Sequence, residues 1–195
     1  MKGLIYHSAF LYHLMMQVIY GKDFVNRYKL VADNIDRNWS VLDLCCGDCY
    51  LKKFLDKSAH YEGRDFNDTF IRSARAHGIV VEHCDIKKGV NVKEKFDCVI
   101  MMGSMYHFIP DADKVLSRMK AVASKRVIIS EPVKNIVTSK NKMVSFIARA
   151  LTNTGGEEIS EIKRLSLDEV KMLYERNGVS YSINAGKDYI GVFDL

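Results

Sequence analysis

The chain has 195 residues, of which 48% are hydrophobic and 27% are charged, and its formal net charge at pH 7 is +5. This length and composition suit one compact domain with a single core and exclude a second full domain. Two prolines, 12 glycines and no repeats or like-charge runs exclude a disordered or repetitive chain. A charge of +5 attracts nucleic acid, a membrane or an anionic substrate only where it is clustered, so it selects none of these partners.

The five cysteines, an odd number, stand at positions 45, 46, 49, 84 and 98 and argue against a disulfide framework. Lys2 precedes an apolar run over residues 9–20 that has some likeness to a signal peptide. His13 and Gln17 interrupt this run, and no cleavage site follows it before Gly21. The run is also too short to span a bilayer. We therefore expect a cytoplasmic protein.

Helical patterns and short apolar runs alternate along the chain. The N-terminal region 1–37 is predicted to be helical, with one apolar stripe formed by Phe24, Tyr28, Val31 and Ile35. The parallel strands predicted after it are Ser40–Leu44, His60–Asp65, Ile79–His83, Phe96–Met102 and Arg126–Ser130. A second helical stripe is formed by Leu116, Met119, Val122 and Ala123. This alternation is typical of parallel strands joined by crossover helices.

The C-terminal part contains a capping box and a predicted hairpin. Ser166 and Glu169 open a helix that is expected to run to about Asn177, with Gly178 as its stop. Two apolar segments, Val179–Asn184 and Tyr189–Leu195, follow as an expected terminal β-hairpin. In open sheets of this kind, ligands bind outside the carboxyl ends of the strands.

Four elements at the ends of the predicted strands carry candidate chemistry. The first strand runs into the turn Val41-Leu42-Asp43-Leu44-Cys45-Cys46-Gly47-Asp48, and Asp65 ends the second strand 18 residues beyond Gly47. Cys84-Asp85-Ile86 follows the third strand. The fourth strand continues into Met101-Met102-Gly103-Ser104-Met105-Tyr106-His107-Phe108. In this order and at these intervals, the four elements resemble the class I S-adenosylmethionine-dependent methyltransferases of the small-molecule type, a seven-stranded Rossmann-like family.

The resemblance covers roughly residues 20–135 and implies the fold, the cofactor and the site. It implies an α/β fold with a doubly wound, mostly parallel seven-stranded sheet, an antiparallel last strand and helices on both faces, as a single domain over 1–195. The implied cofactor is S-adenosyl-L-methionine, with S-adenosyl-L-homocysteine as product. The residues that the resemblance places at the cofactor are Tyr20, Asp43, Cys45, Cys46, Gly47, Asp65, Phe66, Asp85, Ile86, Met102 and Gly103.

The turn after the first strand departs from the family pattern of three alternating glycines. Those positions hold Cys45, Gly47 and Cys49 here. Cysteine is small enough to let the backbone approach the methionine part of the cofactor, but we do not expect it to replace glycine where φ is positive. By the same resemblance Asp65 accepts hydrogen bonds from the ribose hydroxyls, and Asp85 takes the adenine amino group.

His107 and Tyr106 are the candidate catalytic residues, because they follow the fourth strand where the family's loop faces the transferred methyl. A histidine can take a proton from an attacking hydroxyl or amine at neutral pH. The alternative is that His107 only holds the loop, since transfer from a sulfonium often requires only positioning. The loop lacks the Asn/Asp-Pro-Pro-aromatic signature, which disfavours methylation of DNA bases. We expect methyl transfer to an oxygen, nitrogen or carbon atom of a small organic acceptor.

Two flanking segments have expected roles around the site. The region 1–37 resembles the extra helices that form a lid over the cofactor in many small-molecule methyltransferases, and 134–165 is expected to be a helical insertion near the acceptor. Within the insertion, 134–151 has basic residues and an apolar stripe without an acid. Such a helix either contacts a membrane peripherally or packs on its own domain with a solvated basic face.

Other functions fit parts of the same residue pattern. Cys46 and Cys49 form a C-x-x-C between a strand and a predicted helix, a context that also suits a thiol-disulfide oxidoreductase. A nicotinamide dehydrogenase needs the full glycine motif that Cys45 and Cys49 interrupt. The cysteines lack the spacing of a metal site, so no metal is expected. A non-catalytic module that binds S-adenosylmethionine is the remaining alternative, and no oligomeric state is implied.

Overall fold

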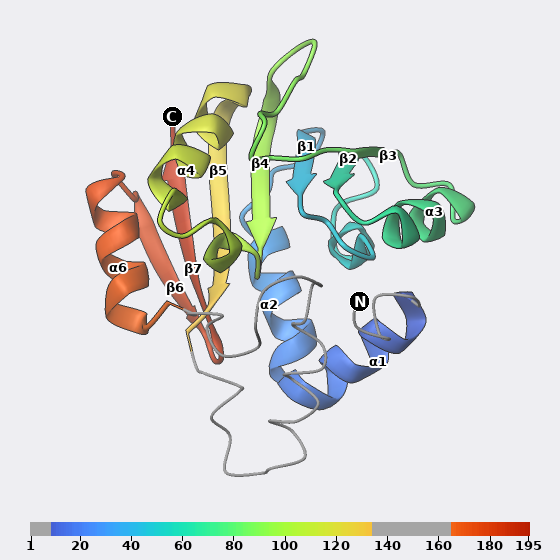
Figure 1. The fold of residues 1–195 in the computed structure, drawn as a ribbon, viewed down its shortest axis with the longest axis horizontal. Helices are drawn as coiled ribbons and strands as arrows, with labels where there is room; N and C mark the ends of the chain where they lie inside the picture. Colours follow the sequence, from blue (N-terminus) through green and yellow to red (C-terminus); the bar gives the residue numbers. More distant parts are fainter. Residues whose placement is uncertain (1–8, 134–164) are drawn as a thin grey trace.

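The computed structural model describes residues 9–133 and 165–195, and a seven-stranded sheet of order β3-β2-β1-β4-β5-β7-β6 forms its centre (Figure 1). The strands are β1 (Ser40–Leu44), β2 (His60–Asp65), β3 (Val81–His83), β4 (Phe96–Met102), β5 (Ala123–Pro132), β6 (Tyr181–Ala185) and β7 (Asp188–Asp194). Strands β1 to β5 pair in parallel, and β7 pairs antiparallel with both β5 and β6. The predicted fold class is confirmed.

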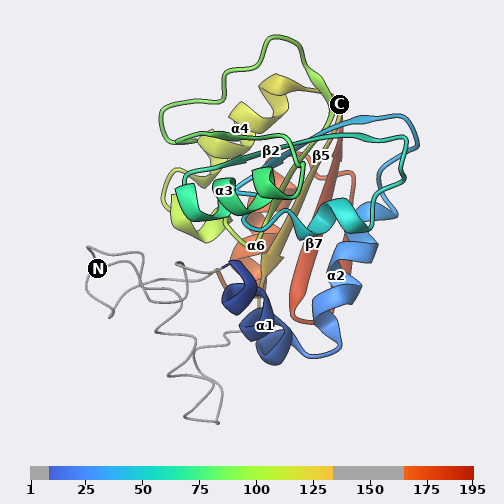
Figure 2. The same cartoon turned by 90° about the vertical axis from the view of Figure 1, so that its right-hand side faces the viewer.

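Helices cover both faces of the sheet, with α2 on one side and α4 on the other (Figure 2). The helices are α1 (Ala9–Tyr20), α2 (Asp23–Ala32), α3 (Asp68–Ala76), α4 (Ala112–Val122) and α6 (Leu167–Arg176), and the 3₁₀ helices are η2 (Tyr50–Lys53) and η3 (Met105–Phe108). Buried residues of α2 and α3 belong to one core cluster, and buried residues of α4 and α6 belong to the other. The sheet therefore separates two hydrophobic layers.

Strand β4 shows why the middle of the sheet is apolar on both sides. Cys98 and Ile100 point into the cluster under α2 and α3, whereas Val99 and Met101 point into the cluster under α4 and α6. Because both faces are covered, the strand has a nearly continuous apolar run instead of an alternating pattern. The expectation that β4 lies mid-sheet is confirmed.

Outside the C-terminal hairpin, the predicted element bounds were wrong at three places. Strand β3 is two residues shorter at its start than predicted, and β5 is longer at both ends because it pairs with β7 as far as Pro132. Ala123 is the first residue of β5 and not the last of a helix. The turn with Cys46 and Cys49 leads into the four-residue 3₁₀ helix η2, where an α-helix was expected.

The predicted C-terminal helix and β-hairpin are both present, although β6 begins at Tyr181, two residues after the predicted start, and β7 begins at Asp188. The side chain of Ser166 accepts a hydrogen bond from the Glu169 N–H, and the Glu169 carboxylate accepts one from the Ser166 N–H at 2.8 Å. Helix α6 ends at Arg176, and Gly178 adopts φ +70° just beyond it. Within 9–133 and 165–195, no helix combines the length and apolar character needed to cross a bilayer. The predicted insertion over 134–165 lies outside the described residues, apart from its last one.

Candidate functional site

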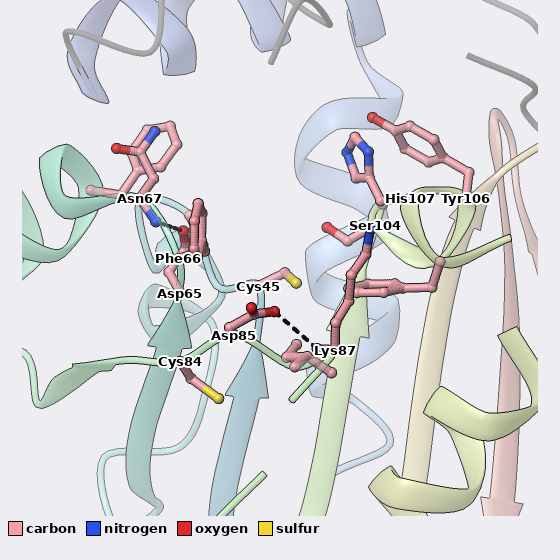
Figure 3. Close-up of a pocket in the computed structure, with 15 residues that line it drawn as sticks. Cys45, Asp65, Phe66, Asn67, Cys84, Asp85, Lys87, Ser104, Tyr106 and His107 are labelled. Carbon is pink, nitrogen blue, oxygen red and sulfur yellow. Dashed lines mark hydrogen bonds between the residues drawn. The ribbon is translucent and has the colours of Figure 1, made fainter. Parts of the chain in front are cut away.

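A cavity of about 410 Å³ opens where β1, β2 and β4 reach their carboxyl ends (Figure 3). Its lining residues are Cys45, Gly47, Asp65, Phe66, Asn67, Phe70, Cys84, Asp85, Ile86, Lys87, Gly103, Ser104, Tyr106, His107 and Phe108. Phe66 and Asn67 stand on one wall, Tyr106 and His107 on the opposite wall, and Cys45 lies between them (Figure 3). The volume lies in the range of small-molecule sites, about 300–1,000 Å³.

The floor of the cavity is the turn after β1, which has an unusual backbone. Cys45, Gly47 and Cys49 all have positive φ, at 56°, 55° and 56°. Our expectation that cysteine does not replace glycine at positive φ was therefore wrong. A side chain in this conformation costs roughly 1–2 kcal/mol, and the turn is held against that cost by two backbone bonds. The Cys46 N–H donates to the Arg64 carbonyl at 3.1 Å, and the Cys49 N–H donates to the Cys46 carbonyl at 2.9 Å.

Asp65 joins this turn to the end of β2. Its carboxylate accepts hydrogen bonds from the Gly47 N–H at 2.8 Å and from the Asn67 N–H at 2.7 Å. Burial raises the pKa of Asp65, while these backbone donors lower it. A carboxylate has about four acceptor positions, so the group has room for a ligand hydroxyl. Asp65 thus serves both as part of the turn and as a wall of the cavity.

The segment after β3 forms the next part of the wall. The Asp85 carboxylate accepts a hydrogen bond from the Lys87 N–H at 3.1 Å, and the neighbouring Ile86 side chain is buried. Phe66, on the wall across from the loop after β4, is 60% exposed, and its ring centroid lies 5.3 Å from that of His83. Apolar and aromatic surface beside carboxylates suits a flat heterocycle that carries hydroxyl and amino donors.

The opposite wall is the loop after β4, which is attached to β5. The Gly103 N–H donates to the Ser130 carbonyl at 2.6 Å, and the Met105 N–H donates to the Glu131 carboxylate at 3.0 Å. The loop continues into η3, where the ring centroids of Tyr106 and His107 lie 3.9 Å apart. These two rings therefore occupy positions set by β5.

A buried charged cluster lies behind this loop. The Arg27 guanidinium donates to the Asp188 carboxylate at 3.3 Å, and the Ser130 hydroxyl donates to the same carboxylate oxygen at 2.8 Å. Arg27 and Asp188 are only 4% and 1% exposed. The guanidinium also lies over the Tyr20 ring, 4.2 Å from its centroid. Ser130 thus links the loop to α2 and β7.

Four of the residues predicted at the cofactor do not line the cavity. They are Tyr20, Asp43, Cys46 and Met102. Asp43 is buried below the turn and accepts a hydrogen bond from the Tyr61 hydroxyl at 2.7 Å. The pKa of Asp43 is raised to about 7, chiefly by burial. The hydrogen bond from Tyr61 lowers this pKa, whereas the nearby Asp65 and Asp48 carboxylates raise it.

Sequence reasoning did not select six lining residues, Asn67, Phe70, Cys84, Lys87, Ser104 and Phe108. All of them except Phe70 lie within two residues of a predicted site residue, so their positions along the chain were a usable signal. Phe70 comes from the first turn of α3. Its contribution depends on how that helix packs, which no local motif indicates.

Helix α1 reaches the same turn from the N-terminal side. The His13 ring is hydrogen-bonded to the Asp48 carboxylate at 2.8 Å, and it makes an edge-on contact with the Tyr50 ring, with centroids 4.2 Å apart. In both ribbon views α1 lies near the carboxyl edge of the sheet (Figures 1 and 2). The region predicted as a lid is thus attached to the floor of the cavity.

Comparison with known proteins finds one family model and several structures of the same fold. Residues 41–126 match the family model of a methyltransferase domain. The fold is similar to that of magnesium protoporphyrin IX methyltransferase from Synechocystis PCC 6803, crystallised with S-adenosylhomocysteine, with a TM-score of 0.61 and 17% identity over 92% of each chain. A methyltransferase domain is thus matched over residues 41–126, and the whole chain shares its fold with a methyltransferase that binds S-adenosylhomocysteine. No curated protein sequence matches this chain significantly.

Two further solved structures share the fold of the methyltransferase. The PH0226 protein from Pyrococcus horikoshii OT3 has a TM-score of 0.61 at 18% identity, and the match covers 90% of each chain. The CurJ carbon methyltransferase has a TM-score of 0.65 at 12% identity, with 92% of this chain and 57% of that chain covered. At such low identity these likenesses show the architecture alone.

The geometry of the C-x-x-C argues against a thiol-disulfide oxidoreductase. Such enzymes need a thiol with a lowered pKa, commonly at a helix N-terminus. The hydrogen bond from Cys49 and burial both raise the pKa of Cys46, and η2 is only a single short turn. Among the described residues, no three histidine, cysteine or acidic side chains are grouped to hold a metal ion.

Proposed function

We propose that the protein transfers the methyl group of S-adenosylmethionine to an oxygen, nitrogen or carbon atom of a small organic acceptor. The observation that carries the proposal is the cavity with the positive-φ residues Cys45 and Gly47 in its floor, the Asp65 carboxylate at the end of β2 and the loop after β4 as its far wall. When bound, the cofactor would supply a methyl group attached to a sulfonium sulfur, from which a neutral thioether departs as a good leaving group.

The described residues fit this cofactor. A Cβ built on Gly47 would meet no atom within 4 Å, so the backbone of the turn is open to close approach. We assign the ribose hydroxyls to the Asp65 carboxylate and the adenine amino group to Asp85, with Ile86 and Phe66 against the ring. The methionine part then lies along Cys45, Gly47 and Gly103, which places the methyl group toward Tyr106 and His107.

Tyr106 and His107 support an acceptor site on the side of the loop after β4. Both rings line the cavity, and both belong to a loop that is hydrogen-bonded to β5. The magnesium protoporphyrin IX methyltransferase and the carbon methyltransferase are named for different acceptors. The fold therefore leaves acceptor identity to residues around this loop.

We propose His107 as the base that accepts the acceptor's proton, with Tyr106 as its neighbour. If His107 acts as the base, His107→Gln should lower kcat and remove the acidic limb of the pH profile of kcat. A role limited to holding the loop predicts an unchanged pH profile together with weaker acceptor binding. Tyr106→Phe keeps the ring and serves as the matched control.

The decisive measurement is a thermal shift with S-adenosylhomocysteine compared with NAD. A ligand at about 100 times its dissociation constant adds roughly 2.7 kcal/mol to the free energy of unfolding. We expect a shift with S-adenosylhomocysteine and none with NAD, and the reverse result would refute the proposal. Cofactor binding without turnover on any acceptor would instead support the non-catalytic module.

We also propose a cytoplasmic location, which is supported by the five free thiols, since reducing compartments keep cysteines unpaired. The lid role of 1–37 is supported by the bond between His13 and Asp48. The peripheral membrane contact through 134–151 lies outside the described residues and stays a prediction, as does the expectation that nucleic acid is not a partner.

A further inference from the structure

The turn under the cofactor contains two thiols in close contact. The Sγ atoms of Cys46 and Cys49 lie 3.4 Å apart. The backbone bond between the same residues, at 2.9 Å, closes a β-turn, which keeps their Cα atoms within about 7 Å. A disulfide usually spans Cα atoms about 4.4–6.8 Å apart. The pair is therefore preorganised for bonding without a rearrangement of the fold.

The neighbouring strand leaves space for both sulfurs. A Cβ built on Gly63 of β2 would lie 2.7 Å from the Cys46 sulfur and 3.3 Å from the Cys49 sulfur. Any residue other than glycine at position 63 would separate the pair or push it out of the turn. The two sulfurs thus lie together against Gly63 of β2, within the turn that forms the floor of the cavity.

We infer that Cys46 and Cys49 form a reversible disulfide that lowers the affinity of the protein for its cofactor. This inference rests on the proposed function. Cys49 is 1% exposed and Cys46 is half-buried. Closing the sulfurs from 3.4 Å to a bond of about 2.05 Å therefore moves Cys46 more than Cys49. Gly47 follows Cys46, and its N–H loses alignment with the Asp65 carboxylate.

The oxidation requires a two-electron oxidant, for which we specify hydrogen peroxide. The Cys46 thiolate attacks one peroxide oxygen, the O–O bond breaks, and a sulfenic acid and one water molecule form. The Cys49 sulfur then displaces the second water and loses its proton, so the two thiols are oxidised to a disulfide while one peroxide is reduced to two waters. Because the pKa of Cys46 is raised by the Cys49 hydrogen bond and by burial, the reaction is slow at neutral pH and responds to sustained oxidation.

The test uses the full chain in reduced and peroxide-treated form. Peptide mapping should find the link between Cys46 and Cys49. Calorimetric titration with S-adenosylhomocysteine should show a dissociation constant about tenfold higher after oxidation, the effect of losing one hydrogen bond to a charged group. Dithiothreitol should restore the original value. By reciprocity, bound S-adenosylhomocysteine should slow the oxidation.

Matched variants identify the cysteines responsible. The rise in the dissociation constant after peroxide treatment should vanish in the double variant Cys46→Ser with Cys49→Ser. It should persist in Cys98→Ala, because Cys98 is buried in β4 away from the turn. Absence of the mapped link, an equal dissociation constant in the linked protein, or a response that depends on Cys84 would overturn the inference. Failure of the reduced protein to bind S-adenosylhomocysteine would refute the proposed function instead, while the mapping would still decide whether the disulfide forms.

Discussion

The turn after β1 and the loop after β4 form opposite sides of one cavity, but they are held in different ways. The turn depends on local bonds over residues 45–49, on Asp65 at the next strand and on a backbone with three positive φ values. The loop depends on β5 and, through Ser130, on the buried pair of Arg27 and Asp188. The turn is therefore held mainly by nearby bonds, whereas the loop depends on distant parts of the fold.

This difference predicts which substitutions affect stability and which affect binding. Substitutions in the buried pair behind the loop should lower the free energy of unfolding, because they leave a buried charge without its partner. Changes in the turn should alter cofactor affinity or local strain with smaller effects on the free energy of unfolding. Four experiments test this contrast.

The largest expected effect is that of Arg27→Met. Removing the guanidinium leaves the Asp188 carboxylate buried without its cationic partner, which typically costs about 3–5 kcal/mol. Urea unfolding should show this loss in the free energy of unfolding. The control is Arg176→Met, because the pair between Arg176 and Asp113 is about half exposed and exposed pairs contribute about 0–1 kcal/mol. Equal effects of the two substitutions would contradict the role assigned to the buried pair.

The second effect is a dependence of stability on pH that comes from Asp43. The pKa of Asp43 is about 7 in the folded protein against an ordinary value of 3.8. The protonated carboxyl therefore adds to the free energy of unfolding at low pH, and this contribution is lost as the pH rises through 7. At about 1.4 kcal/mol per pKa unit, the change between pH 5 and pH 8 amounts to about 3 kcal/mol. Urea unfolding at both values should show that Asp43→Asn removes this loss.

Asp97 is the control for that experiment, because its pKa shift has the opposite sign. Hydrogen bonds from Ser40 and Lys125 lower the pKa of Asp97, so its contribution is present above its ordinary pKa and is lost as the pH falls. Asp97→Asn should therefore lower the free energy of unfolding by a similar amount at pH 5 and pH 8, approach the wild-type stability in acid, and leave the slope between pH 5 and pH 8 intact. A slope that survives Asp43→Asn would show that another group causes it.

The third effect concerns affinity and not stability. Asp65→Ala removes the acceptor for the Gly47 and Asn67 N–H groups and the acceptor that we propose for a ribose hydroxyl, so the dissociation constant of S-adenosylhomocysteine should rise about tenfold or more. Calorimetric titration measures it. Asp97→Ala, at the amino end of β4, is the comparison and should leave the affinity unchanged. An unaltered dissociation constant in Asp65→Ala would remove this residue from the site.

The smallest effect is the relief of backbone strain at Cys45. Glycine adopts positive φ without a Cβ penalty, so Cys45→Gly should stabilise the protein by up to about 1 kcal/mol, or about 2–4 °C in Tm. Cys49→Gly has the same φ but loses a fully buried side chain, so its gain should be smaller. Differential scanning calorimetry of both variants measures the difference. A greater gain at Cys49 would show that the strain is concentrated there.

The sequence predicted the features that depend on nearby residues better than those that depend on distant ones. Strands β1, β2 and β4 have the predicted bounds because their apolar runs end at clear turn residues. The capping box at Ser166 was readable because it is encoded within four residues. The cavity residues near Gly47, Asp65 and Asp85 were found because the family motif places each at the end of a strand.

The features that were missed depend on contacts between distant parts of the chain. Arg27 and Asp188 are 161 residues apart, and no periodicity relates them. The positive φ of Cys45 and Cys49 was missed because residue preference alone argues against it, whereas the surrounding hydrogen bonds impose it. The short η2 helix was missed because the turn resembles one that leads into a longer helix.

The antiparallel direction of β7 has a practical consequence for experiments. Because β7 runs against β5, the last residue lies at the amino edge of the sheet, where the Leu195 N–H donates to the Lys125 carbonyl at 2.9 Å (Figure 1). The cavity opens at the other edge. A surface anchor or fluorescent label attached at Leu195 would therefore leave the entrance unobstructed.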